Sequence, residues 1–135
     1  GKLLIIYIPA QILGCLLGVM LANVFFEHDI LELSTKNRDG FHIFLSEIIA
    51  TFGLIFIIFA NLKDGKITIA ASVATYIMAG YWFTSSTSFA NPAVAIARTF
   101  TDSFTGINYI NTPTYILAEF LGALIAVFLI KKLIK

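Results

Sequence analysis

The sequence has few charged residues for its length. Only 13% of its 135 residues are charged, whereas 59% are hydrophobic, and the mean hydropathy is +0.90. Soluble domains carry about 25% charged and roughly 45–50% apolar residues. This composition excludes an ordinary soluble domain and predicts an integral membrane protein.

Other absences narrow the function. Cys15 has no second cysteine to pair with, which excludes a disulfide within the chain. His28 and His42 have no further ligand at metal spacing, and no Walker loop, nucleophile triad or basic nucleic-acid patch is present. We therefore expect no enzyme activity, no metal or other cofactor, and no nucleic-acid partner.

Long apolar segments predict four membrane spans. They cover about residues 3–26, 41–62, 67–83 and 115–130. About 20 apolar residues cross a hydrocarbon core of roughly 30 Å, and only the last of these segments is shorter than usual. We expect an all-α membrane protein. Because the chain starts at Gly1 without a methionine and enters the first span at once, we also expect a segment upstream of it.

The basic residues predict an orientation. With alternating spans, one side of the membrane receives Lys36, Arg38 and Arg98, and the other receives Lys2, Lys63, Lys66, Lys131, Lys132 and Lys135. Cytoplasmic loops are enriched in lysine and arginine, so the side with six lysines is expected to be cytoplasmic. The acidic connection at residues 27–39 then lies outside, where its charges are those of a solvated loop.

The first and last apolar segments resemble each other. Residues 7–19 and 115–127 match at seven of thirteen positions without a gap. Their shared small residues at four-residue spacing are Gly14 and Gly18, and Gly122 and Ala126. Such residues let helices approach closely, and the two segments run in opposite directions, which predicts an inverted repeat. Chance similarity between two apolar helices is the alternative.

A hydroxyl-rich stretch at residues 84–101 separates the third and fourth spans. Asn91 is a favoured N-cap residue and Pro92 a favoured first helical residue, so together they predict a helix from there to about Thr101. This helix is too short to span, which predicts a re-entrant loop and a half-helix whose positive end repels cations near the midplane. The Asn91 amide could donate to a solute. An exposed loop followed by a helix is the alternative.

Four segments then carry a family resemblance. They read "FANPAVAIAR" from Phe89, "SEIIATFGLIFIIF" from Ser46, "YIPAQILGCLLG" from Tyr7 and "AEFLGALIAV" from Ala118. Together they resemble the aquaporin, or major intrinsic protein, family over nearly the whole chain. The resemblance implies a right-handed helical bundle with an inverted repeat, of which this chain supplies spans three to six and the second half-helix. It also implies one pore per subunit and a homotetramer.

The resemblance assigns roles to single residues. The residues that match the second Asn-Pro-Ala triplet of the family are Asn91, Pro92 and Ala93. This triplet is implied to meet a first triplet at the pore centre and to orient permeating molecules. Glu47 matches a glutamate that braces the re-entrant loop. Glu119 pairs with Gln11 in the repeat, and both a structural role and a pore role stay open for it.

The selectivity filter departs from the common pattern. Many members place an arginine directly after the triplet, where this chain has Val94, and Arg98 follows one turn later on the same helix face. Arg98 either faces the outer vestibule or ends the helix, paired with Asp102. The other filter positions fall near Ser88 and Ala79. These small residues imply a wide filter, as in bacterial members that are associated with glycerol or uncharged metalloid acids.

Three functions are compatible with the sequence. The first is a passive channel subunit for water or small uncharged solutes. The second is a secondary transporter, for which only Glu47 and Glu119 could serve as coupling carboxylates. The third is a non-conducting remnant or assembly partner. A chain with a single half-helix is expected to conduct little alone, and to leave the hydroxyls of residues 84–88 facing lipid with unmet hydrogen bonds.

Overall fold

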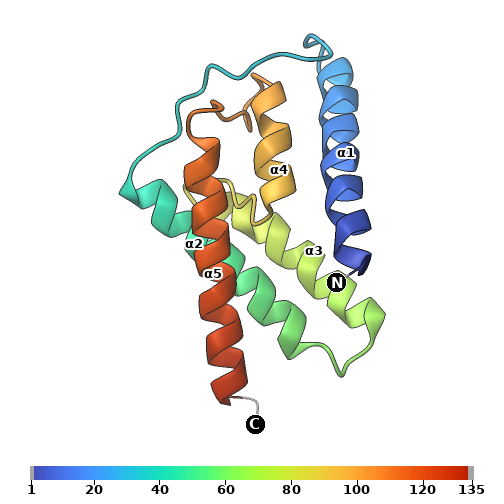
Figure 1. Ribbon diagram of the computed structural model, residues 1–135, viewed down its shortest axis with the longest axis vertical. Helices are drawn as coiled ribbons and strands as arrows, with labels where there is room; N and C mark the ends of the chain where they lie inside the picture. The colour runs from blue at the N-terminus through green and yellow to red at the C-terminus, as the bar shows by residue number, and fades with distance from the viewer. Residues whose placement is uncertain (1, 134–135) are drawn as a thin grey trace.

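The computed structural model describes residues 2–133 and shows helices joined by loops, with no strand in that range (Figure 1). The elements are α1 (Lys2–Phe25), α2 (Phe41–Ala60), α3 (Lys66–Phe83), α4 (Pro92–Ala97), the 3-10 helix η1 (Arg98–Phe100) and α5 (Thr112–Leu133). Three of these described helices, α1, α2 and α5, are long and apolar enough to cross a membrane. An all-helical membrane protein is thus confirmed. The helix α3 occupies the third predicted span, whose membrane crossing stays a prediction.

The helix boundaries follow from local residue chemistry. The backbone at Gly40 and Gly65 has positive φ angles of 105° and 90°, and these two glycines directly precede α2 and α3. The helix α5 begins three residues before the predicted span, because Pro113 suits a first helical turn. It also continues beyond the predicted end, through Lys131 and Lys132. Basic side chains are favourable in a last turn.

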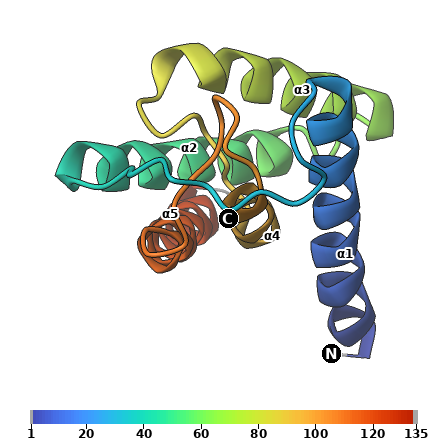
Figure 2. The same ribbon diagram turned by 90° about the horizontal axis from the view of Figure 1, so that it is seen from above.

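The helices α2 and α5 form the most closely packed pair. A Cβ atom added to Gly122 of α5 would collide with the carbonyl oxygen of Ile48 in α2, and would lie 3.0 Å from Cβ of Thr51. The two backbones are therefore in contact at this level. Figure 2 shows the short helix α4 between α5 and α1, and α1 packs mainly against α4 and η1. Most of the large apolar side chains of α1 are exposed.

The two segments that are similar in sequence have different environments. Gly122 has no room for a side chain, whereas a methyl group added at Gly14 or Gly18 would have nothing within 4 Å. Glu119 is buried, and its counterpart Gln11 is exposed. Matching positions of the two similar segments are therefore packed differently in this chain.

The ends of the helices agree with alternating crossings. The start of α1, the turn between α2 and α3, and the end of α5 all lie in the lower half of the view in Figure 1, and the connection of residues 26–40 begins at the top of that view. Lys63 and Lys66 flank that turn, and Lys131 and Lys132 lie in the last turn of α5. Lys135 and the side chain of Lys2 lie outside the described part.

Candidate functional site

The segment between α3 and α4 follows a tight, buried path. Every residue from 84 to 90 is buried except Ser85. Thr87, Ser88 and Ala90 have backbone φ angles of 67°, 51° and 51°. Residues other than glycine seldom adopt this left-handed region. The side-chain oxygen of Ser86 accepts the backbone N–H of Ser88 at 3.2 Å. The hydroxyls of this stretch thus help to satisfy a backbone that cannot form regular hydrogen bonds.

The expectation that residues 84–88 of this chain would face lipid with unmet hydrogen bonds is wrong for most of this stretch, in which only Ser85 is exposed. Ser46 of α2 accepts the backbone N–H groups of Ser85 at 2.9 Å and Ser86 at 3.4 Å. Tyr115 of α5 donates its hydroxyl to the Ser86 carbonyl at 3.3 Å. The reason is that α2 and α5 supply the partners themselves. Among the hydroxyls of this stretch, the Ser88 hydroxyl is buried without a partner in the described residues.

Asn91 caps α4 as predicted. Its side-chain oxygen accepts the backbone N–H of Ala93 at 2.9 Å, and Pro92 is the first helical residue. The predicted helix to about Thr101 is formed by α4 and η1, which end at Phe100. The side-chain N–H₂ of Asn91 donates no hydrogen bond within residues 2–133. That donor is thus available to a molecule outside the chain, although a pore role for Asn91, Pro92 and Ala93 stays a prediction.

Two buried glutamates hold the start of this helix. One carboxylate oxygen of Glu47, in α2, accepts the backbone N–H of Ala90. One carboxylate oxygen of Glu119, in α5, accepts the backbone N–H of Asn91 at 3.1 Å. The bracing contact expected for Glu47 is therefore present. Glu119 makes the same type of contact, through the backbone N–H of Asn91. The sequence had left both a structural role and a pore role open for it.

The structure does not bring all the predicted filter residues together. Ser88 is buried beside Gly80, where an added Cβ would lie 2.6 Å from the Ser88 hydroxyl, and Ala79 is exposed. Val94 lies on α4 and lines a groove of about 230 Å³ between α4 and α1, as does Arg98. The filter assignment itself stays a prediction.

Arg98 does not pair with Asp102 in the described chain. Its guanidinium donates to the Thr105 hydroxyl at 2.6 Å and lines a second cavity of about 310 Å³ near the C-terminal end of α1. Asp102 instead accepts hydrogen bonds from Ser34 and Thr35. Arg98 does stand at the C-terminal end of α4, as one alternative held, but the ion pair with Asp102 is absent from the described residues. A role for Arg98 in the outer vestibule stays a prediction.

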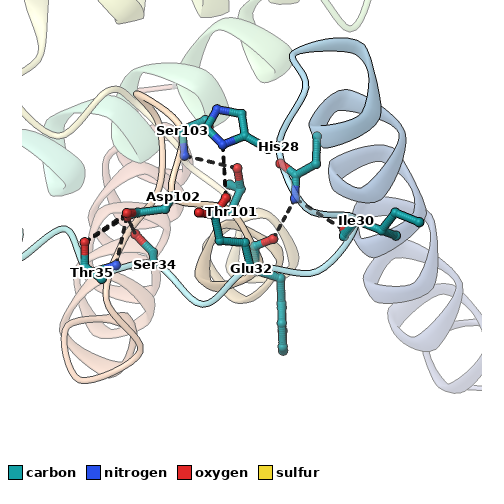
Figure 3. A network of polar contacts seen from close by, with 10 residues as sticks. His28, Ile30, Glu32, Ser34, Thr35, Thr101, Asp102 and Ser103 are labelled. Atoms are coloured by element: carbon teal, nitrogen blue, oxygen red, sulfur yellow. Dashed lines mark hydrogen bonds and ion pairs between the residues drawn. The ribbon is translucent and has the colours of Figure 1, made fainter.

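Polar contacts hold the long connection of residues 26–40 against the segment that follows α4 and η1 (Figure 3). Asp102 accepts the Thr35 backbone N–H at 2.8 Å and the Thr35 hydroxyl at 3.0 Å. The Thr35 backbone N–H, followed by its hydroxyl, lowers the pKa of Asp102 below its ordinary value of 3.8. His28 lies 3.0 Å from Glu32 in the same connection. These contacts place the connection against the half-helix.

Sequence reasoning missed the contacts of Arg38. It treated this arginine as a loop charge, but one guanidinium nitrogen donates to the Thr87 hydroxyl at 3.3 Å and the other to the Phe104 carbonyl. The guanidinium also lies 5.9 Å from the centre of the Phe104 ring. Arg38 therefore links three loops that are far apart in sequence. No local pattern around residue 38 could have indicated this.

One curated protein is similar to this chain in sequence. The chain is 43% identical over 129 residues, which is 96% of its length, to the aquaglyceroporin AqpS of Rhizobium meliloti (strain 1021). Over nearly its whole length, the chain is thus similar to a member of the aquaporin, or major intrinsic protein, family. The aligned part is 55% of that relative, so the chain spans about half the length of the curated protein it matches. No family model and no solved structure matches the chain.

Proposed function

We propose that this chain is part of a passive channel subunit for water and small uncharged solutes. The observation that carries the proposal is the buried re-entrant segment that ends in the Asn91-capped helix α4. Backbone of this kind survives at membrane depth only inside protein or beside a water-filled cavity. The Asn91 N–H₂, which has no partner among residues 2–133, is a donor suited to a passing solute.

The proposed channel needs a second segment. We assign this chain to spans three to six and the second half-helix of a right-handed bundle with an inverted repeat. The other half would bring two spans and a further Asn-Pro-Ala triplet, and complete subunits would form a homotetramer. The 55% coverage of the relative supports this division. The side with Lys63, Lys66, Lys131 and Lys132 would face the cytoplasm.

The two intramembrane carboxylates favour a channel over a secondary transporter. A transporter needs groups that bind a coupling ion and release it, and such groups face a cavity or bundle interior. Glu47 and Glu119 are buried, and each already accepts a backbone N–H of the re-entrant segment. Their contacts are those of structural braces. The proposed solutes are water and glycerol-like molecules, and the absence of an arginine at Val94 extends the range to uncharged metalloid acids.

The function is tested by Asn91→Asp in proteoliposomes that hold the chain with a complementary aquaporin segment. We expect solute flux to fall by about tenfold or more, because a charge at the bilayer centre costs about 2.5–3.5 kcal/mol and the amide donor is lost. Asn108→Asp is the matched control, since the side-chain oxygen of Asn108 also accepts the N–H two residues on, at 3.0 Å, but in an outer loop. Equal flux in the Asn91 variant and the control, at equal protein density, would refute the role of Asn91.

The width of the filter is tested by Val94→Arg. Arginine adds bulk and a fixed charge to the groove beside α4, so glycerol flux should fall several-fold more than water flux. Val94→Leu is the control for bulk without charge, and it should reduce glycerol flux only modestly. Equal loss of both fluxes in Val94→Arg would show that position 94 acts through folding and not through selection.

A further inference from the structure

Glu47 and Glu119 form a closed pair of carboxyl groups at the base of the re-entrant segment. They are 0% and 1% exposed, and they belong to the closely packed helices α2 and α5. The backbone N–H groups that they accept come from the consecutive residues Ala90 and Asn91. In each carboxyl group, the second oxygen is buried and has no hydrogen-bond partner among the described residues.

Within the described part of the chain, no cation neutralises this pair. No lysine, arginine or histidine lies within ion-pair distance of Glu47 or Glu119 there. The nearby titratable groups on the packed elements are tyrosines that donate elsewhere. Tyr76 of α3 donates to the Ala50 carbonyl at 3.0 Å, and Tyr115 of α5 donates to the Ser86 carbonyl.

The surroundings therefore oppose a double negative charge. An ionised carboxylate in an apolar interior is costly unless it is paired, and two within range of each other repel as well. The two groups accept the N–H groups of consecutive residues, which brings each within reach of the other's charge. Pairs of buried carboxyls in this situation commonly hold one proton between them.

We propose that Glu47 and Glu119 bind one proton between them. One group is then a carboxylic acid whose O–H points toward the free oxygen of the other, which stays a carboxylate. This supplies the donor that both unpartnered oxygens lack, and it leaves the two remaining oxygens free to hold Ala90 and Asn91. The proton thus joins α2, α5 and the start of α4 in one buried site. This proposal about the carboxyl pair does not depend on whether the chain conducts solutes.

Infrared spectroscopy of the purified chain, in a detergent without ester groups, tests the proposal. Only a protonated carboxyl gives the C=O stretch of an acid, and exposed Asp and Glu side chains are ionised at neutral pH. At pH 7 we expect a band equal to one carboxyl per chain, calibrated against the acid-denatured chain. In Glu119→Gln, the amide oxygen can still accept the Asn91 N–H, and the amide N–H₂ can donate to Glu47 in place of the proton. Glu47 then stays ionised, so the acid band should vanish. Glu47→Gln should give the same result.

Asp64→Asn is the control, because it removes an exposed carboxyl from the turn between α2 and α3 and should leave the band unchanged. Circular dichroism checks that each variant is folded. A native chain without the band would mean that both groups are ionised. A band of two carboxyls that halves in each glutamine variant would mean that both are protonated. Either result overturns the shared proton, and the native spectrum alone decides it if a variant fails to fold.

Discussion

Residues 1–135 reconstituted alone are expected to pass no more glycerol or water than liposomes without protein. The helix α4 has six residues and is about 9 Å long, whereas the hydrocarbon core is about 30 Å thick. In the structure, the side of α4 toward α1 is an open groove, and much of α1 is exposed. A continuous path therefore needs walls that this chain does not supply.

Adding a segment with two further spans and the other Asn-Pro-Ala triplet, fused or as a separate chain, should restore flux. The complementary segment alone is the control, and it should conduct as little as residues 1–135 alone. Stopped-flow light scattering measures both fluxes at known protein density. Strong flux from the 135-residue chain alone would contradict the division into halves and would indicate that two antiparallel copies build one pore.

Gly122→Ala is expected to separate α2 from α5 and to destabilise the chain by about 1–3 kcal/mol, the usual cost of overpacking. The new methyl group would meet the carbonyl oxygen of Ile48 and Cβ of Thr51, and a backbone atom cannot rotate away as a flexible side chain can. Because Glu47 and Glu119 lie on these two helices, their hold on the re-entrant segment should weaken too. Circular dichroism monitors the loss of helical structure as denaturant is added, and this denaturation curve gives the change in the free energy of unfolding.

The chain offers its own control for this substitution. Gly14 and Gly18 correspond to Gly122 and Ala126 in the sequence repeat, but an added methyl group at Gly14 or Gly18 has nothing within 4 Å. Gly14→Ala should therefore leave the stability of the isolated chain unchanged or raise it slightly, because alanine favours a helix. If Gly14→Ala and Gly122→Ala destabilised the chain equally, the close contact between α2 and α5 would not be what matters at Gly122.

The features that sequence predicted well depend on local chemistry. Long apolar segments place the helices within a few residues, because helix length follows from membrane thickness. The start of α4 follows from the capping and first-turn preferences of Asn91 and Pro92. Glu47 stood out as a carboxylate within an apolar segment, whereas its bracing role was implied by the family resemblance and not by local chemistry.

The features that sequence missed depend on contacts between distant segments. Arg38 reaches Thr87 and Phe104 only after the connection of residues 26–40 has folded across α4. The repeat did not reveal that Glu119 is buried while Gln11 is exposed, since similar residues can face different neighbours. A count along the sequence placed filter positions at Ser88 and Ala79, but it could not show that Ser88 packs against Gly80, because that contact depends on the rotation of α3.

The central claim is that this chain helps to form a passive channel, and the dependence of glycerol flux on concentration and ion gradients tests it most directly. The measurement uses proteoliposomes that contain the chain with its complementary segment. We predict uptake that rises in proportion to glycerol concentration and does not change when a proton or sodium gradient is imposed. Saturable uptake that a gradient drives above equilibrium would contradict the account and would identify a coupled transporter.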